Sequence, residues 1–460
     1  MQVNPIFNAD LIRRYDKAGP RYTSYPTAVQ FHDKFSEEDY RQQVALSNQR
    51  GGPLSLYFHI PFCDTVCYYC ACNKIVTKDR SKAQPYLEDL YREMALQSAL
   101  FDTGRPVEQL HWGGGTPTFL SLEQMRELMT KTGEYFELKT DDSGEYSIEV
   151  DPREADASTV ALLRELGFNR MSLGVQDFDP VVQKAVNRIQ SETQTFEVFN
   201  AARAEGFHSI SIDLIYGLPF QSVDSFLRTL DKVIAASPDR LSIFNYAHLP
   251  ARFKPQRRIS EADLPSPAEK LAILESTIHH LTDAGYVLIG MDHFAKPDDP
   301  LAQAQRNGTL HRNFQGYSTH ADCDMVAMGV SAIGQVADAF SQNVKDTESY
   351  HRILSEGRLP IERGLIVNED DKIRRAVIMQ LICHFELDGD AFGKEWNIDF
   401  ADYFSEEMQR LKMFTEDGLI TIRGNHITVE PVGRLMIRNI CMTFDRYLDP
   451  SGTQRFSKTI

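Results

Sequence analysis

The chain contains 460 residues, of which 42% are hydrophobic, and it carries a formal net charge of −16. A chain of this length can bury one large core and a smaller second one, so we expect a barrel-sized domain with an appended domain. The acidic charge argues against nonspecific binding to nucleic acid, and the lack of a signal-peptide pattern or a long apolar run predicts a soluble, cytoplasmic protein with no membrane partner.

Residues 1–50 are expected to form an N-terminal strap. Within it, residues 20–27 (PRYTSYPT) are too short and too interrupted by proline to form a helix, yet they combine Arg21 with aromatic side chains. One interpretation is a segment that wraps over a flat anionic ligand. The other is a purely structural strap that packs against the barrel, and the sequence alone does not decide between them.

Residues 51–300 alternate between short β-rich runs and amphipathic stretches whose apolar residues recur every three or four positions. The predicted strands are residues 54–59, 109–112, 146–150, 170–173, 209–214 and 241–246. The predicted helices are residues 86–100, 122–136, 159–166, 194–205 and 223–235. This alternation, with right-handed crossovers, predicts an α/β fold in which six parallel strands and outer helices form a partial (β/α)6 barrel similar to a TIM barrel.

The remaining residues differ in pattern from the barrel. Residues 301–367 are expected to form a connecting segment that completes the active site. Residues 368–460 then predict helices over 370–385, 403–411 and 434–447, with a hairpin over 420–429. This order resembles a winged-helix module. Because the chain is acidic and the module has no basic stripe, a structural cap is favoured over a DNA-binding wing.

Four of the seven cysteines, Cys63, Cys67, Cys70 and Cys72, lie within ten residues. In a cytosolic chain such a cluster suits zinc or an iron–sulfur cluster better than disulfides. Structural zinc usually takes two C-x2-C pairs, or one pair and two distant histidines. The C-x3-C-x2-C spacing instead supplies three thiolates from one loop and leaves one iron of a cubane cluster open, which is the signature of radical S-adenosylmethionine enzymes.

Polar or glycine-rich residues follow the predicted strands. In chain order these are the cysteine loop, residues 113–117 (GGGTP), Glu149 with Asp151, Gln176, Asp213 with Gly217, and Ala247. Because active sites of such barrels lie at the carboxyl ends of the strands, we expect these residues to converge. The glycines let backbone approach a ligand or form a tight turn. The two carboxylates are candidates for acid–base catalysis, for binding ribose hydroxyls or an ammonium group, or for salt bridges at the rim.

The chain resembles one family along almost its whole length. The segments that carry the resemblance are residues 19–22 (GPRY), 57–63 (YFHIPFC), 70–74 (CACNK), 111–117 (HWGGGTP), 290–294 (GMDHF), 311–317 (HRNFQGY) and 438–441 (RNIC). They are similar to the oxygen-independent coproporphyrinogen III oxidases, radical S-adenosylmethionine enzymes of haem biosynthesis.

The resemblance implies a cofactor set. Cys63, Cys67 and Cys70 would hold a 4Fe-4S cluster, while Tyr57 and Cys72 would be catalytic, Cys72 without being a ligand. The family is similar in binding two S-adenosylmethionine molecules. The positions matching the first are Tyr57, Gly114, Glu149 and Ile333, and those matching the second are Tyr69, Gly115, Thr116, Gln176, Arg188, Asp213 and Ala247.

The implied reaction is oxidative decarboxylation of the ring A and ring B propionates of coproporphyrinogen III to the vinyl groups of protoporphyrinogen IX. A side-chain base cannot remove a hydrogen from an unactivated propionate carbon, so a radical made on a cofactor suits this step. The reaction would need a low-potential electron donor and a further electron acceptor that the sequence does not identify. Arg21, Lys74 and Arg312 are candidates for binding the substrate carboxylates.

Two other functions compete with this interpretation. Haem chaperones of the same superfamily share the cluster loop and transfer haem, but they lack the fourth cysteine and the long N-terminal strap. An electron carrier would normally need a fourth cluster thiolate, often before proline, whereas Cys72 precedes Asn73. Both comparisons favour the enzyme. No extended apolar interface helix is evident, so we expect a monomer.

Overall fold

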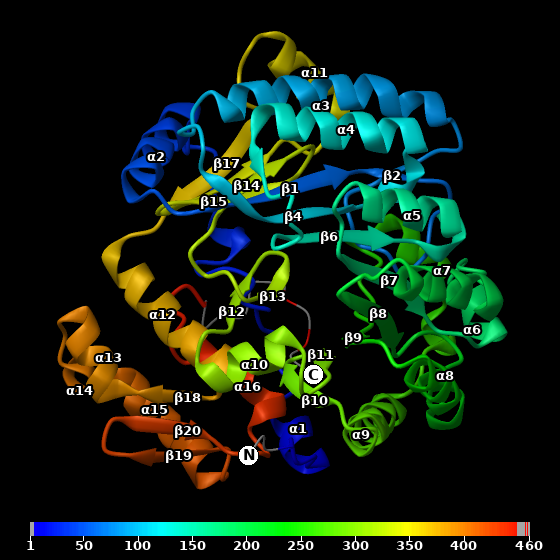
Figure 1. Ribbon diagram of the computed structural model, residues 1–460. Coiled ribbons are helices and arrows are strands. Elements are labelled where there is room, and N and C mark those ends of the chain that lie inside the picture. Colours follow the sequence, from blue (N-terminus) through cyan, green and yellow to red (C-terminus); the bar gives the residue numbers. More distant parts are fainter. Residues whose placement is uncertain (1–3, 449–455, 457, 459–460) are drawn as a thin grey trace.

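The computed structural model describes residues 4–448, 456 and 458, and its main feature is a curved 13-stranded sheet (Figure 1). The strand order is β10-β11-β9-β8-β7-β6-β4-β1-β14-β15-β16-β17, with β5 (Glu137–Leu138) beside β4. The central strands are β1 (Leu54–Ile60), β4 (Pro106–Gly114), β6 (Glu145–Val150), β7 (Arg170–Gln176), β8 (Ser209–Tyr216) and β9 (Arg240–Asn245). They pair in parallel and in chain order, which confirms the predicted six-stranded partial barrel.

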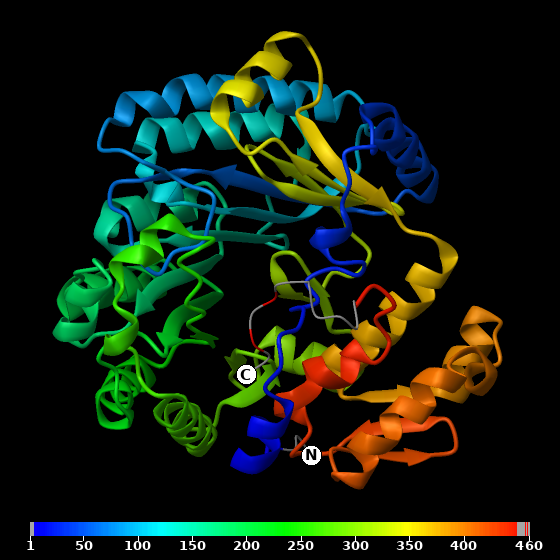
Figure 2. The ribbon, with the colours of Figure 1, turned by 180° about the vertical axis from the view of Figure 1, so that it is seen from behind.

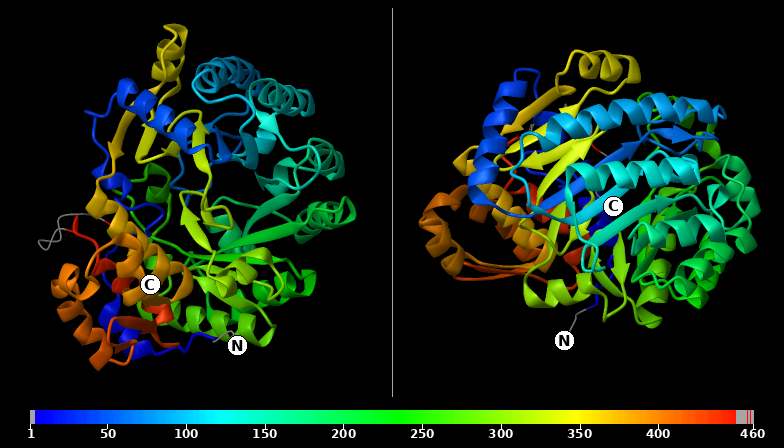
Figure 3. Two further views of the ribbon diagram at one scale, coloured as in Figure 1. Left: turned by 60° about the vertical axis from the view of Figure 1, so that its left-hand side comes forward. Right: turned by 45° about the horizontal axis from the view of Figure 1, so that its top comes forward.

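Helices cover the convex face of this sheet (Figures 1 and 3). They are α3 (Ala83–Ser98), α4 (Leu122–Tyr135), α5 (Ala157–Glu165), α6 (Pro180–Ala185), α7 (Glu192–Ala204), α8 (Val223–Ala236) and α9 (Pro267–Asp283). All five predicted helices are present. Capping boxes fix several of their starts, because the side chains of Ser121 and Ser222 accept hydrogen bonds from the first turns of α4 and α8.

The sheet continues beyond the six predicted strands without closing. At one edge, β14 (Asp324–Met328) pairs in parallel with β1, and β15 (Ile333–Val336), β16 (Ala339–Asn343) and β17 (Ile361–Ile366) follow in antiparallel order. At the other edge lie the antiparallel strands β11 (His293–Ala295) and β10 (Val287–Gly290). The remaining elements here are the pairs β2 (Phe62–Cys63) with β3 (Ile75–Val76) and β12 (His311–Asn313) with β13 (Gly316–Ser318), and the helices α10 (Pro300–Asn307) and α11 (Thr347–Ser355).

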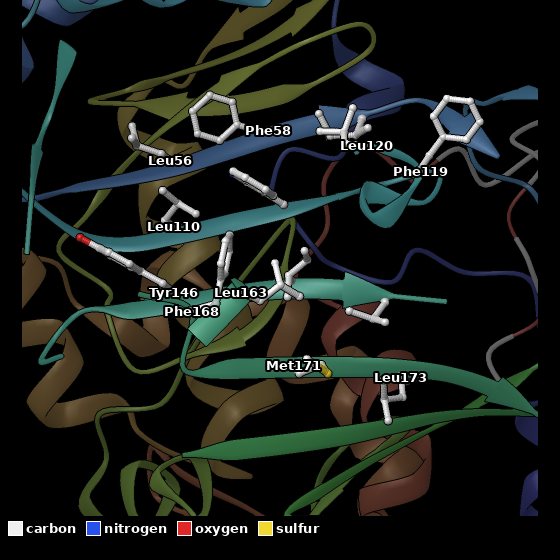
Figure 4. Close-up of a cluster of buried hydrophobic side chains, with 14 of the residues drawn as sticks. Leu56, Phe58, Leu110, Phe119, Leu120, Tyr146, Leu163, Phe168, Met171 and Leu173 are labelled. Carbon is white, nitrogen blue, oxygen red and sulfur yellow. The ribbon is translucent and has the colours of Figure 1, made fainter. Parts of the chain in front are cut away.

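The two faces of the sheet differ in chemistry because side chains alternate along each strand. Residues such as Leu56, Leu110, Tyr146 and Met171 belong to the core under the outer helices (Figure 4). Their neighbours in sequence point to the concave face and are largely polar. These concave-face residues are Tyr57, His59, His111, Ser147, Glu149, Ser172 and Asp213.

A C-terminal helical domain follows the sheet. It contains α12 (Glu369–His384), α13 (Gly389–Trp396), α14 (Phe400–Tyr403), α15 (Ser405–Glu416) and α16 (Ile437–Met442), with a small sheet in the order β18 (Glu386–Asp388), β20 (His426–Val429) and β19 (Ile420–Arg423). The predicted helix over 434–447 is present but shorter: a 3-10 turn over Arg434–Met436 leads into α16, which ends at Met442. The chain turns there since the carboxylate of Asp445 accepts hydrogen bonds from the Tyr22 hydroxyl (3.0 Å) and the Tyr447 amide (2.9 Å).

The N-terminal strap contains α1 (Ala9–Tyr15) and α2 (Glu37–Arg50), and between these helices it crosses the open side of the sheet (Figure 2). Residues 20–27 are not helical, as predicted. Tyr22 and Tyr25 are buried in a second core that also contains residues of α12 and α16. Residues 12–25 of the strap therefore pack on the C-terminal domain, whereas Tyr40 and Val44 of α2 belong to the core of the main sheet. No helix in the described part of the chain is long and apolar enough to cross a membrane.

Candidate active site

The cysteine loop leaves the carboxyl end of β1 and is closed at its base by parallel pairing of β2 with β3. The Ile75 amide donates to the Pro61 carbonyl (2.7 Å), and the Thr77 amide donates to the Cys63 carbonyl (2.9 Å). All seven cysteines of the chain are free thiols. Cys63, Cys67 and Cys70 therefore lie on one short loop that is closed by the β2–β3 pairing. None of the three thiols is used in a disulfide.

Cationic groups surround these thiols. Arg153 and Arg188 each place a guanidinium nitrogen 3.6 Å from the Cys67 sulfur, and both also pair with Asp151, at 2.6 and 3.0 Å. Lys74 donates to the Cys70 carbonyl at 3.1 Å. The Cys72 thiol, through its hydrogen bond, lowers the pKa of Cys70, and Lys74 acts in the same direction. This environment favours the thiolate at Cys70, which is the form that binds metal, whereas burial raises the pKa of Cys63 to about 11.

The glycine run at the carboxyl end of β4 has a structural reason that the sequence did not reveal. A Cβ on Gly115 would lie 2.7 Å from the backbone of Pro61 and Phe62, and one on Gly114, whose φ is +114°, would lie 2.7 Å from the His59 ring. The absence of side chains lets the amides of Gly115 and Thr116 donate to the Ile60 and Phe62 carbonyls, both at 2.8 Å. The glycine run is therefore hydrogen-bonded to the segment that leads into the cysteine loop and fixes the position of that segment.

Three adjoining cavities lie on the concave face. The first, the cysteine cavity, has a volume of about 280 Å³. It brings together most of the residues that the sequence indicated, namely Cys63, Cys67, Tyr69, Cys70, Cys72, Lys74, Gly114, Gly115, Thr116, Glu149, Gln176, Arg188 and Asp213. The second, the side cavity, is lined by Tyr57, His59, His111, Glu149, Phe314, Gln315 and Ile333, among others. Glu149 belongs to both cavities.

The third cavity, the inner cavity, lies where the central strands begin. Glu145, Arg170, Ser209 and Arg240, which line it, are the first residues of β6, β7, β8 and β9. The β12–β13 hairpin contributes the opposite wall through Asn313 and residues 315–318. The inner cavity shares Ser172 with the cysteine cavity and shares His111 and Gln315 with the side cavity.

Two carboxylates of the cysteine cavity, Glu149 and Asp213, have different electrostatic surroundings. Burial alone would raise the pKa of Glu149, but the His111 ring (3.4 Å) and the Gly114 amide (3.1 Å) outweigh it and hold this pKa below its usual range. Burial raises the pKa of Asp213 to about 6, although the Ser172 hydroxyl donates to it at 2.8 Å. Glu149 is therefore an anion at neutral pH, whereas Asp213 can hold a proton in mildly acidic solution.

Tyr57 is oriented by a residue that the sequence patterns did not indicate. His59 places Nε2 3.0 Å from the Asn73 carbonyl, which can only accept, so Nε2 carries the proton. Its Nδ1 lies 3.1 Å from the Tyr57 hydroxyl and accepts that hydrogen bond. Burial lowers the pKa of His59, which keeps the ring neutral. The signal available in the sequence was the alternation of polar Tyr57 and His59 with apolar neighbours along β1.

Four of the indicated residues lie apart from the cavity linings, and one of them is Gly217, which follows β8. Ala247 follows β9 and lines none of the three cavities that the described residues form. Arg21 pairs with Asp292 and stacks 5.8 Å from the ring of Phe244, which lines the cysteine cavity. Arg312 is only 3% exposed and lies 4.6 Å from the Tyr317 ring.

Arg153, which contacts the Cys67 sulfur, was not indicated by the sequence, because a single arginine after a strand resembles a surface residue.

The donor set fits an iron–sulfur cluster. Three free thiols on one loop face a cavity, and cations stand beside them in place of further thiols. The same cavity offers a charged carboxylate and bare backbone at Gly114 and Gly115, which suits a ligand with ammonium and hydroxyl groups. The arrangement can hold a cluster with one open iron and a polar cosubstrate next to it.

Comparisons with known proteins agree with this geometry. The sequence matches the Radical SAM superfamily over residues 57–233 and the HemN C-terminal domain over residues 367–436. It is 58% identical over 454 residues to the oxygen-independent coproporphyrinogen III oxidase of Pseudomonas aeruginosa, with 99% of each chain covered. It is 52% identical to the Escherichia coli enzyme of that name, with 98% of each chain covered. The solved coproporphyrinogen III oxidase (HemN) from Escherichia coli, described as a radical SAM enzyme, superimposes with a TM-score of 0.92 at 50% identity, covering 97% of this chain and 100% of that one.

Proposed function

The chain belongs to the family of oxygen-independent coproporphyrinogen III oxidases, and we propose that it oxidatively decarboxylates the ring A and ring B propionates of coproporphyrinogen III to give protoporphyrinogen IX in haem biosynthesis. The observation that carries this proposal is the set of three free thiols, Cys63, Cys67 and Cys70, facing a cavity at the carboxyl ends of six parallel strands. Active sites of such sheets lie at this edge.

Members of the radical SAM superfamily use a 4Fe-4S cluster and S-adenosylmethionine, and we assign the cluster to these three cysteines. Two S-adenosylmethionine molecules would bind here. The first would contact Tyr57, Gly114, Glu149 and Ile333, and the second would contact Tyr69, Gly115, Thr116, Gln176, Arg188, Asp213 and Ala247. The junction of the side and cysteine cavities at Glu149 supports two adjacent ligands. When bound, these groups supply one-electron chemistry that can take a hydrogen atom from an unactivated carbon.

The protein's own side chains would position the reactants. Arg153 and Arg188 place positive charge beside the Cys67 sulfur, and charged Glu149 would accept hydrogen bonds from a ligand ammonium or hydroxyl group. His59 orients the Tyr57 hydroxyl, which we assign together with Cys72 to catalysis. Arg21, Lys74 and Arg312 are assigned to the substrate carboxylates. The reaction would also need an acceptor for the electron released with carbon dioxide, and a low-potential electron donor. We expect a monomeric, cytoplasmic enzyme.

Genetic complementation tests the proposed function. A bacterial strain without its own coproporphyrinogen oxidases should grow anaerobically without added haem when it expresses this chain, and it should not grow with Cys67→Ser. A haem chaperone, the competing function, would not restore haem synthesis. Failure of the wild-type chain to support growth at normal expression would contradict the proposal.

A further inference from the structure

The inner cavity and the residues packed directly against its lining contain more cationic groups than their carboxylate partners neutralise. Arg170 donates from Nη2 to Glu145 (2.8 Å), and Arg240 donates from Nε to Asp299 (2.8 Å). The other oxygen of Glu145 is occupied by Gln109 at 3.1 Å. Arg312 does not line the cavity, but its guanidinium lies 4.6 Å from the ring of the lining residue Tyr317. It is buried and has no carboxylate partner among the described residues. Two guanidinium groups in the lining and one beside it are therefore balanced by only two carboxylates, which leaves one positive charge.

Several buried hydrogen-bond donors in this region are also unsatisfied. Among the residues that the structure describes, Arg170 Nε and Nη1, Arg240 Nη2, and Arg312 Nε and Nη1 have no partner. His293 does not add charge, because burial and the nearby Arg312 and Arg21 hold its pKa well below the usual range. Buried donors without partners are rare in folded proteins, and an unpaired buried cation is strongly unfavourable. A bound anion would accept hydrogen bonds from these donors and would neutralise the unpaired positive charge.

Charge and shape select the class of anion. One surplus positive charge matches a single monoanion, and guanidinium groups pair with the two oxygens of a carboxylate through parallel hydrogen bonds. The hydroxyls of Ser209, Ser211 and Ser242 on the strands and the amide of Asn313 on the opposite wall add polar groups to the cavity. The cavity volume of about 180 Å³ is smaller than the roughly 300–1,000 Å³ of sites that enclose whole small molecules. It therefore suits one carboxylate arm of a larger ligand.

We propose that the inner cavity binds one propionate carboxylate of the tetrapyrrole and so anchors the substrate; this inference rests on the proposed function. The cavity lies at the amino ends of the strands, whereas the cysteines lie at their carboxyl ends, so the anchored propionate is one that does not react in that binding mode. Shared walls at Ser172, His111 and Gln315 let the ring system extend from the inner cavity into the other two.

Two variants test the anchor by different routes. Arg312→Met removes the surplus charge without leaving a carboxylate unpaired, so the thermal midpoint of the ligand-free protein should stay the same or rise. Ser211→Leu fills the cavity without touching an ion pair. Each should raise KM for coproporphyrinogen III by about 10- to 100-fold, with a smaller change in kcat and an unchanged Kd for S-adenosylmethionine. The same weakening should appear in the Kd of coproporphyrin III, the inert oxidised form, measured by fluorescence.

Arg105→Met is the matched control. Arg105 is equally buried, but it pairs with Asp324 at 3.0 Å and lines none of the three cavities formed by described residues. This variant should lower stability and leave KM unchanged. An unchanged KM and Kd in both test variants would overturn the inference. The inference would also be overturned if the variants weakened the binding of S-adenosylmethionine and left the binding of coproporphyrin III unchanged. The cavity would then bind the methionine carboxylate. Wild-type turnover tests the proposed function separately, and the Kd of coproporphyrin III does not depend on turnover.

Discussion

Cys72 differs from the other three cysteines of the loop in its exposure and its neighbours. It is the exposed member of the four, and a hydrogen bond to Cys70 together with the Cys70 charge raises its pKa well above the usual range. A protonated thiol is a poor cluster ligand and a possible hydrogen donor. We therefore predict that Cys72→Ser keeps its iron and its electron paramagnetic resonance signal but loses turnover, whereas Cys67→Ser loses both. Loss of iron in Cys72→Ser would contradict this division of roles.

Asp213 should make the stability of the cofactor-free protein depend on pH. Its pKa is raised from 3.8 to about 6, so its stabilising contribution is complete below about pH 4 and is lost as the pH rises through about 6. Two pKa units correspond to at most about 3 kcal/mol. Asp213→Asn lacks this loss, so its free energy of unfolding should exceed that of the wild type increasingly between about pH 4 and pH 7. Denaturant titrations check this, with the exposed Asp298→Asn as the control. Parallel pH profiles would contradict it.

At the scale of elements, the glycine run and the cysteine loop form one unit. Gly115→Ala would place a methyl group 2.7 Å from the Pro61 and Phe62 backbone and should cost about 1–3 kcal/mol. We predict less iron bound per chain after reconstitution and slower turnover. Gly133→Ala in α4 meets its nearest atom only at 3.6 Å and should be neutral or stabilising by up to about 1 kcal/mol. Equal iron content in both variants would show that the run does not hold the loop.

The elements that could be predicted are those with long periodic patterns. The six central strands and their helices carry a clear alternation, and β1 begins at Leu54 as predicted. The extension from β14 to β17 could not be predicted. Its strands are short, and Gly334, Gln335 and Gln342 interrupt their apolar character. They become strands because β1 offers an unpaired edge, which is a property of the folded sheet and not of the local sequence.

The candidate site shows the same division. The cysteine spacing, the glycine run and the strand-end carboxylates were visible in the sequence because each is locally unusual. Arg153, Arg170 and Arg240 were not, since an arginine near a strand end is usually a surface residue. Only the curvature of the sheet turns Arg170 and Arg240 toward a common cavity. The charges inside the barrel could not be predicted from the sequence, because residues far apart in the chain come together there only in the folded sheet.

At the scale of the whole molecule, the strap and the C-terminal domain act together. Arg438 donates to the carbonyls of Gly19 and Pro20, the latter at 2.8 Å, and Asn439 donates to the Tyr15 carbonyl at 2.8 Å. Arg438→Met should weaken this attachment by about 1.5–3 kcal/mol. We predict faster hydrogen exchange in strap residues 12–25 with unchanged iron content. Arg423→Met, on the exposed tip of β19, is the control, and unchanged exchange in the strap would contradict the coupling.

The central claim is that this chain oxidises coproporphyrinogen III with its three-cysteine loop, and anaerobic turnover tests it most directly. The reconstituted protein would be supplied with S-adenosylmethionine, a low-potential reductant, an electron acceptor and coproporphyrinogen III, and both products would be measured by chromatography. We predict protoporphyrinogen IX with one 5′-deoxyadenosine per propionate lost, and neither product with Cys67→Ser. Cleavage of S-adenosylmethionine without protoporphyrinogen IX, or stoichiometric haem binding in its place, would contradict the account.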